Sequence, residues 1–182
     1  MKRFLIPFVC ACALVAGTPL FAAKPEGGSS KWKEVAAMMQ FMREEEKLAR
    51  DVYLKLNEKY HGDTNTFEKI AGSEQEHTDA VKDLLEKYGV EDPAADTDEG
   101  EFVNKELQEL YETLVGIGEE GLTEALNVGV TIEKKDMDDI ADAIDLSRKY
   151  PDIVKVYSNL LAGSESHLAA FLAALDTAAD DD

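Results

Sequence analysis

Apolar residues recur at three- and four-residue intervals along most of this chain, a spacing that predicts amphipathic helices rather than strands. Four principal helices are expected, over about 33–60, 67–88, 128–148 and 152–175. Residues 101–117 and a shorter piece around 122–126 carry the same spacing and predict connecting helices between the second and third. Gly89 is placed to end the second helix and Pro151 to begin the fourth. The pattern therefore predicts an all-α fold.

Polar residues interrupt the apolar face of every principal helix. On the second helix Glu74 and His77 lie three residues apart, so they point the same way, alongside apolar neighbours. On the first helix Glu46 falls within the apolar stripe, and Glu45 lies close to the same face, so periodicity alone does not choose between them. The other interruptions are Glu133 and Asp136 on the third helix and His167 on the fourth.

Six such interruptions on four helices indicate a metal site. A carboxylate or imidazole on a buried face is costly to desolvate unless it is compensated, and a metal ion shared between helices is one compensation. Taken singly, each has a plainer reading, because a buried histidine is more often hydrogen-bonded in the core. His61 lies in a turn and is read as a surface residue. A ligand set rich in oxygen, poor in nitrogen and without sulfur suits iron or manganese, and it could also take zinc or copper.

The N-terminal residues are typical of a secretory signal. Lys2 and Arg3 precede an apolar stretch, and small residues follow it, so residues 1–23 are predicted to be removed on export to the periplasm or the medium. Residues 24–32 then form a flexible leader, 33–176 one domain and 177–182 an acidic disordered tail. Both cysteines fall inside the signal, which leaves the mature chain without a disulfide or a thiolate metal site. No later segment is long enough to span a membrane.

The charge is strongly negative and excludes some partners. The formal net charge is −19, and loss of Lys2 and Arg3 with the signal lowers it to −21. Nucleic acids and anionic lipids both require basic patches, so neither is an expected partner. The charge favours solubility and attracts cations, and its plainest reading is the solvated surface of an exported protein.

Two sequence motifs resemble those of rubrerythrin-like proteins. Residues 46–53 (EKLARDVY) resemble their first-helix pattern, a ligand glutamate followed by Ala-Arg and an aromatic residue, and residues 74–77 (EQEH) resemble their second-helix Glu-x-x-His. His167 with Phe171 four residues later resembles the end of their fourth-helix motif. The run 43–175 is similar to uncharacterised ferritin-like domains of bacteria and archaea. The resemblance implies a ferritin-like four-helix bundle with a helical crossover between helices two and three.

The same resemblance implies roles for the candidate residues. It favours Glu46 over Glu45, makes Glu133 the third-helix ligand and adds Asp136 as a further carboxylate. Glu74 would bridge two metals, Glu46 and His77 would hold one, and Glu133 and His167 the other. Tyr53 is placed to hydrogen-bond a ligand carboxylate. One departure from the family pattern is that Ser164 stands where a bridging glutamate is expected, three residues before His167.

Two functions are compatible with these residues. The first is an oxidoreductase with a dinuclear iron or manganese centre that reacts with dioxygen or peroxide and takes electrons from an external donor. The second is a non-catalytic helical bundle that binds metal or a partner through an incomplete site, a reading that Ser164 supports. A ferritin-style storage cage is a weaker third idea. A homo-oligomer is compatible with every reading.

Overall fold

The computed structural model describes residues 30–180, and these fold into five α-helices with no strand among them. The predicted signal, residues 1–23, lies outside the described residues. The helices are α1 (Ser30–Tyr60), α2 (Thr66–Tyr88), α3 (Lys105–Gly118), α4 (Leu122–Leu146) and α5 (Pro151–Asp180). The predicted all-α class is therefore confirmed for the described chain. The four-helix bundle remains a prediction, since five helices are present.

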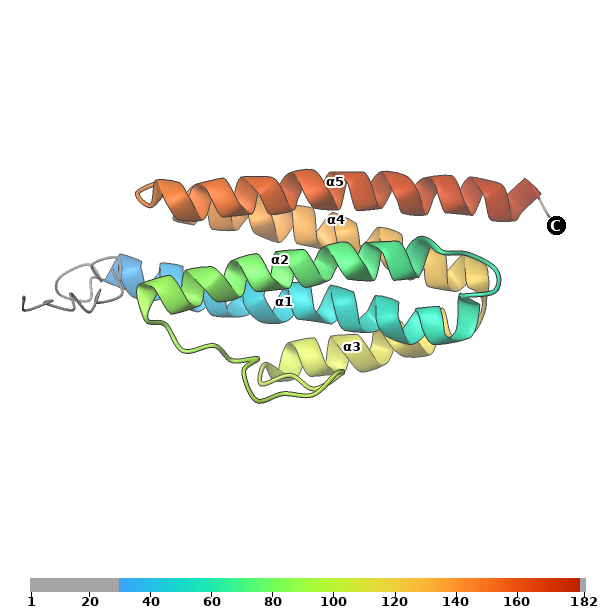
Figure 1. Cartoon of the computed structure of the whole chain (residues 1–182), viewed down its shortest axis with the longest axis horizontal. Coiled ribbons are helices and arrows are strands. Elements are labelled where there is room, and N and C mark those ends of the chain that lie inside the picture. The colour runs from blue at the N-terminus through green and yellow to red at the C-terminus, as the bar shows by residue number, and fades with distance from the viewer. Residues whose placement is uncertain (1–29, 181–182) are drawn as a thin grey trace, which may run out of the picture.

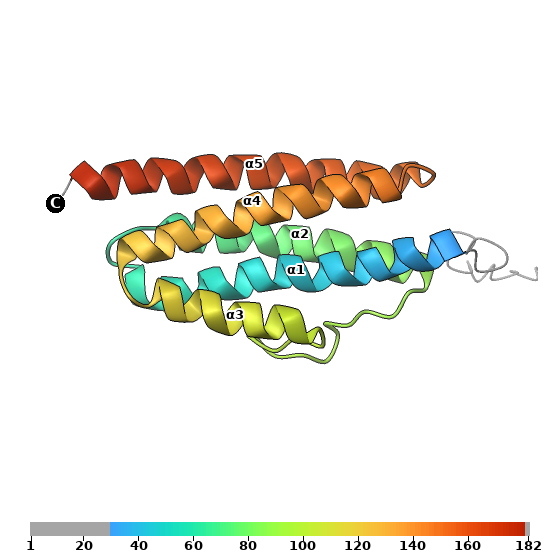
Figure 2. The same ribbon diagram turned by 180° about the vertical axis from the view of Figure 1, so that it is seen from behind.

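The long helices lie side by side in two antiparallel pairs (Figures 1 and 2). A short turn joins α1 to α2, another joins α4 to α5, and these two pairs make the most extensive helix contacts. Contacts of α1 with α4 and of α2 with α5 close the arrangement. The segment from Gly89 to Gly121, which contains α3, carries the chain back so that α4 runs in the direction of α2. In consequence, α3 packs on the outside of α1 and α4.

The third principal helix differs from its prediction, because residues 122–126 and 128–146 form one helix, α4, without a break. Gly129 lies inside this helix, and a Cβ at that position would come within 2.5 Å of the Phe171 ring. The glycine therefore allows α4 and α5 to approach closely and does not interrupt the helix. Periodicity alone cannot tell these two uses of glycine apart.

Two helix ends also lie outside their predicted bounds. Helix α1 already begins at Ser30, within the predicted leader, because Trp32 is buried against the rings of Tyr88 and Tyr150. Helix α5 continues to Asp180, beyond the predicted end of the domain at residue 176. By contrast, Gly89 ends α2 as predicted, with a φ of 61° that a residue without a side chain adopts at little cost.

The apolar core is divided into two clusters along the length of the molecule. One contains Phe67 and Phe171, together with Leu56 of α1. The other contains Met42 of α1 and Tyr157 of α5. Glu46 lies on α1 between Met42 and Leu56, so the polar positions of the four long helices fall between the two clusters. Within residues 30–180, no helix is long and apolar enough to cross a membrane.

Buried charged residues of α1 also hold the segment that leads into α3. We call Glu44, Lys47 and Asp51 the loop anchor. The Lys47 ammonium donates to Asp51 Oδ2 at 2.6 Å and to the backbone carbonyl of Asp98 at 2.7 Å. Asp51 also accepts from the backbone N–H of Gly100 at 2.9 Å. Glu44 accepts from the N–H groups of residues 103 and 104, so the anchor fixes this segment to α1.

Candidate metal centre

The centre is a buried triad of Glu74, His77 and His167. These residues each offer one ligand atom, and the three atoms lie within 4.8 Å of one another. Glu74 Oε2 lies 3.0 Å from His77 Nδ1, and Glu74 Oε1 lies 2.8 Å from His167 Nδ1. Both imidazoles therefore turn the same ring nitrogen toward one carboxylate. The pairing of α2 with α5 brings His167 to the Glu-x-x-His of α2.

Two further glutamates flank the triad on opposite sides. Glu46 Oε2 of α1 lies 3.2 Å from His77 Nδ1, and Glu133 Oε2 of α4 lies 3.5 Å from His167 Nδ1. Tyr53 donates its hydroxyl to Glu133 Oε1 at 2.7 Å, so the predicted contact with a candidate ligand carboxylate is present. The structure thus brings five of the six predicted residues together as a central glutamate with one Glu–His pair on each side.

Asp136, the sixth predicted residue, lies one turn beyond Glu133 on α4 and is held by Ser164. The Ser164 hydroxyl donates to Asp136 Oδ2 at 2.6 Å, and both residues are buried. Burial raises the pKa of the Asp136 carboxyl, and the charges of Glu46 and Glu74 raise it further. Asp136 therefore lies in the electrostatic field of the centre. The hydroxyl at position 164 orients a carboxylate from α4, whereas the rubrerythrin-like pattern that the sequence resembles has a glutamate at this position.

Ser73 is a functional contact that the sequence analysis missed. Its hydroxyl oxygen lies 2.8 Å from His167 Nε2. An Nε2–H that donates to this oxygen leaves the lone pair of Nδ1 to face Glu74 and Glu133, and such a partner fixes the ring orientation of a metal-binding histidine. Ser73 precedes Glu74 in the sequence, but no spacing rule identifies which residue of a neighbouring helix it contacts.

Several ligand-type atoms in the centre have no hydrogen-bond partner. They are both oxygens of Glu74, Nδ1 of His167, Oε1 of Glu46, Oε2 of Glu133 and Oδ1 of Asp136. Glu74 Oε1 and His167 Nδ1 lie only 2.8 Å apart, yet they lack the alignment that a hydrogen bond requires. Buried polar atoms are seldom left unpaired. Glu74 and His167, which carry three of these unpaired atoms, belong to the triad whose ligand atoms lie within 4.8 Å of one another, as the ligands of an ion do.

The pKa values show how protons are held in the metal-free centre. Burial alone would raise the pKa of the Glu74 carboxyl, but the close contacts with the His167 and His77 rings lower it to about 2. Burial alone would lower the pKa of both imidazoles, but their carboxylate partners raise it to about 11 for His77 and about 9 for His167. Burial raises the pKa of Glu133 to about 7. At neutral pH two protonated imidazoles therefore offset part of the buried negative charge.

Glu45 and His61 lie away from the centre. Glu45 is buried, but its Oε1 accepts from the Lys135 ammonium at 3.1 Å, on the side of α1 that faces α3 and α4. Glu46 contacts His77 instead. The geometry therefore favours Glu46 over Glu45 as the candidate ligand of α1, which periodicity alone could not decide. His61 is exposed in the turn between α1 and α2, as expected.

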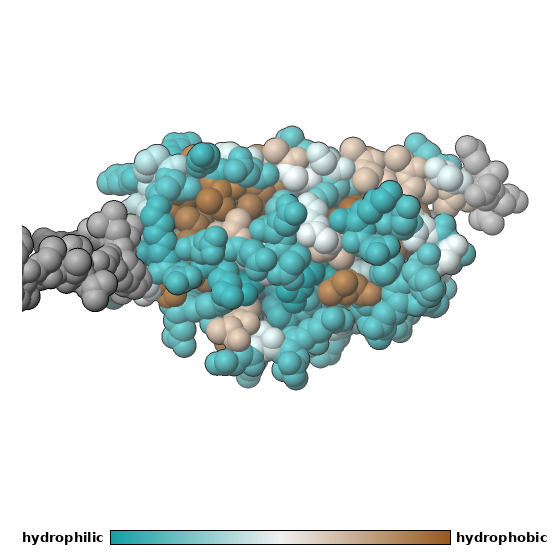
Figure 3. Space-filling view, in the orientation of Figure 1, coloured by the Kyte–Doolittle hydropathy of each residue, from teal (hydrophilic) through white to brown (hydrophobic). Residues whose placement is uncertain are grey.

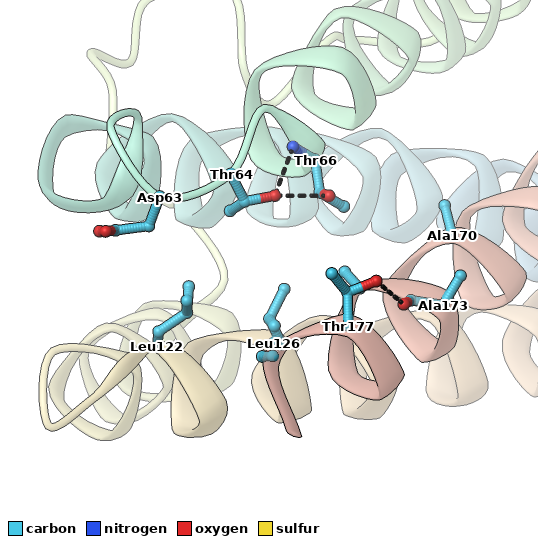
Figure 4. A pocket seen from close by; sticks show the side chains of 10 residues that line it. Asp63, Thr64, Thr66, Leu122, Leu126, Ala170, Ala173 and Thr177 are labelled. Atoms are coloured by element: carbon cyan, nitrogen blue, oxygen red, sulfur yellow. Dashed lines mark hydrogen bonds between the residues drawn. The ribbon is translucent and has the colours of Figure 1, made fainter. Parts of the chain in front are cut away.

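A pocket of about 390 Å³ opens at one end of the molecule, between the α1–α2 turn, the start of α4 and the end of α5 (Figure 4). Its walls are mainly apolar and hydroxyl side chains, such as Leu122, Leu126 and Thr66. Asp63 is its only carboxylate among the lining residues, and none of the six predicted ligands reaches it. This pocket is therefore separate from the centre.

Comparisons with known proteins agree with the fold. The chain is 47% identical over 135 residues to the uncharacterized protein MJ0754 of Methanocaldococcus jannaschii, an alignment that covers 74% of this chain and 71% of that protein. The crystal structure of the hypothetical protein MJ0754 from Methanococcus jannaschii is similar to this one with a TM-score of 0.77 and 44% identity, over 85% of each chain. Residues 35–180 match the family model described as an uncharacterized protein domain, DUF2202. Because this match covers most of its length, the chain belongs to the DUF2202 family.

Proposed function

We propose that this protein is an exported, ferritin-like metal-binding protein with a dinuclear iron or manganese centre that reacts with dioxygen or peroxide. Helices α1, α2, α4 and α5 would be its four-helix bundle, and α3 would lie in the crossover between the second and third bundle helices. In such bundles, two helices supply one glutamate each and the other two supply a Glu-x-x-His motif each. Export rests on the signal-like residues 1–23.

The observation that carries this proposal is the set of unpaired ligand atoms around Glu74. Four carboxylates and two imidazoles from four helices are buried in this part of the molecule, and with neutral imidazoles and ionised carboxylates they would leave a large uncompensated negative charge. Buried charge of this kind is costly unless it is paired. Two divalent cations would balance it, so the residues present fit the proposed metal.

The two sides of the centre assign the ligands. Glu46 and His77 would hold one ion, Glu133 and His167 the other, and Glu74, which contacts both imidazoles, would lie between them. Asp136, oriented by Ser164, would contribute the further carboxylate that α5 lacks. The ligand set of oxygen with two nitrogens suits iron and manganese, and zinc or copper could also bind.

In the proposed reaction the metal would supply electrons, and the side chains of the protein would hold the ligands in place. Two ferrous ions would supply one electron each to dioxygen or peroxide. Tyr53 holds Glu133 in place through its hydroxyl, and Ser73 fixes the ring of His167. Residues 30–180 contain no cysteine for an internal rubredoxin-type donor, so turnover would draw on an external electron donor.

A ferrous titration tests this function. Wild-type protein is titrated anaerobically with Fe²⁺, then exposed to oxygen or peroxide while the near-ultraviolet spectrum and the remaining Fe²⁺ are followed. We expect two equivalents to bind and to be oxidised. Glu74→Gln should abolish oxidation without unfolding the protein, because it removes the carboxylate that both imidazoles contact. Glu76→Gln, an exposed change on the same helix, is the matched control and should behave like wild type. Oxidation retained in the Glu74 variant would refute the assignment.

The non-catalytic alternative is favoured by a specific observation at Ser164. A hydroxyl there cannot bridge two ions as a carboxylate does, so the centre has one α5 carboxylate fewer than the rubrerythrin-like pattern. In that case the protein would bind metal, or a partner, without oxygen chemistry. Tight Fe²⁺ binding with no oxidation in the same titration would support this second function.

A further inference from the structure

The two imidazoles stand at the outer edge of the centre, between α2 and α5. We call Ser73 and His77 of α2, with Gly163 and His167 of α5, the α2–α5 seam. His77 is 9% exposed and His167 is 6% exposed, whereas Glu46, Glu74 and Glu133 are 1% exposed. Figure 3 shows apolar residues exposed between α5 and α2 toward the end of the molecule where α5 begins. The centre therefore comes closest to solvent at the seam.

Gly163 lies directly against the His77 ring. A Cβ at position 163 would lie 2.4 Å from His77 Nε2 and 2.5 Å from Cε1, much closer than atoms that are not bonded can approach. Glycine inside a helix costs about 0.5–1 kcal/mol relative to alanine. Gly163 lies within α5, away from any turn, so close packing against the imidazole is what the absence of a side chain permits.

Gly72 gives a direct contrast on the other side of the seam. It also lies inside a long helix, α2, but a Cβ there would meet no atom within 4 Å. Alanine can therefore be introduced at position 72 without displacing any neighbour. At position 163 the same change must move either His77 or the helix that carries it.

We propose that Gly163 is a positioning residue for the metal centre. Its missing side chain lets the His77 ring lie on the α5 backbone, with Nδ1 turned inward to Glu46 and Glu74 and the Nε2 edge turned outward in the seam. A methyl group at this position pushes the ring out of the seam and separates Nδ1 from both carboxylates. This inference rests on the proposed dinuclear centre. It predicts that a side chain at position 163 removes metal binding only on the side of the centre formed by Glu46 and His77.

The test compares Gly163→Ala with wild type, His77→Ala and Gly72→Ala by anaerobic Fe²⁺ titration and by the melting temperature of the metal-free protein. We expect two equivalents for wild type and Gly72→Ala, and one for Gly163→Ala and for His77→Ala. The double variant His77→Ala with Gly163→Ala should match His77→Ala, because the glycine acts through that ring. The metal-free Gly163→Ala protein should stay folded and melt close to the metal-free His77→Ala protein, because both changes take the same ring away from Glu46 and Glu74.

Each other outcome contradicts a stated part of the proposal. Two equivalents at unchanged affinity in Gly163→Ala would overturn the positioning role and leave the dinuclear centre standing. A double variant that binds less metal than His77→Ala would show that the methyl group damages the helix packing rather than the ring. Failure of wild type itself to bind two equivalents would overturn the proposed centre together with this inference.

Discussion

Helix α1 contributes to two groups of buried charged side chains, the loop anchor and the candidate metal centre. The two groups differ in how many of their polar atoms have a hydrogen-bond partner. In the loop anchor, Lys47 and Asp51 form a 2.6 Å ion pair, and the remaining hydrogen bonds are made with the Arg50 guanidinium and with backbone groups of the segment before α3. In the candidate metal centre, Glu46 precedes Lys47 in the sequence and is equally buried, but one of its oxygens and both oxygens of Glu74 have no hydrogen-bond partner. Burial is therefore alike in the two groups.

The difference teaches that unsatisfied ligand atoms, rather than buried charge, distinguish a binding site from a structural network. A satisfied network stabilises the fold, and removing one member exposes the other to an uncompensated environment. An unsatisfied cluster destabilises the fold until something binds. Substitutions in the anchor should therefore act on the stability of the fold, and substitutions in the centre on metal binding; the first experiment below tests the anchor and the next two test the centre.

The largest effect is expected in the loop anchor. Asp51→Ala leaves the buried Lys47 ammonium without its carboxylate, and breaking a buried pair in this way typically costs about 3–5 kcal/mol in the free energy of unfolding. Chemical denaturation of the metal-free protein measures the change, and metal stoichiometry should stay at the wild-type value. Asp145→Ala, which breaks the exposed pair with Arg148, is the control and should cost less than about 1 kcal/mol. If both variants lost the same free energy of unfolding, the buried ion pair of the loop anchor would be no more important for stability than the exposed pair.

An effect of intermediate size is expected when the pH is changed. A rise in pH should strengthen metal binding and lower the stability of the metal-free protein. The raised pKa values of His77 and His167 mean that a metal must displace protons from both rings, so the apparent affinity should rise by up to about 100-fold per pH unit below pH 9. The same protons stabilise the metal-free fold at pH values below the ordinary histidine pKa, and this stabilisation is lost as pH rises through the raised values. Between pH 6 and pH 8 the measured metal affinity should rise, whereas the melting temperature of the metal-free protein should fall. A parallel trend would contradict the assignment of these protons to the centre.

The smallest effect is expected at Ser164. Ser164→Ala removes the hydroxyl that donates to Asp136 at 2.6 Å, and loss of such an orienting partner typically weakens metal binding about tenfold. Competition with a chromogenic chelator measures the change. Ser166→Ala, an exposed change on the same helix, should leave affinity unchanged. Unchanged affinity in the Ser164 variant would mean that Asp136 does not contribute to the centre.

The sequence predicted the helices and the candidate ligands for one physical reason: both follow from spacing along a single helix. Glu74 and His77 three residues apart, or His167 four before Phe171, can be read without knowing any other helix. The choice of Glu46 over Glu45 needed the family resemblance, and the geometry agrees, because Glu46 contacts His77 whereas Glu45 contacts Lys135.

Contacts between helices escaped prediction. Ser73 and Gly163 have no distinctive position on their own helices, and their roles appear only when α2 and α5 are placed together. Trp32 was assigned to a flexible leader because its aromatic partners are far away in the sequence. The piece around 122–126 was predicted to be separate from the helix over 128–148, because the contact of Gly129 with Phe171 of another helix cannot be seen in the spacing. Ion occupancy of the centre remains a prediction that the titration addresses.

The division of the fold into two antiparallel pairs gives the centre a mechanical role. The protein can be regarded as two helical hairpins, α1–α2 and α4–α5, docked face to face, and Glu74 with His77 belongs to one hairpin while Glu133 with His167 belongs to the other. Any ion shared by these residues would cross-link the hairpins midway along their length. Hydrogen exchange at the hairpin interface should then slow on metal binding far more than exchange at the outer ends of the helices.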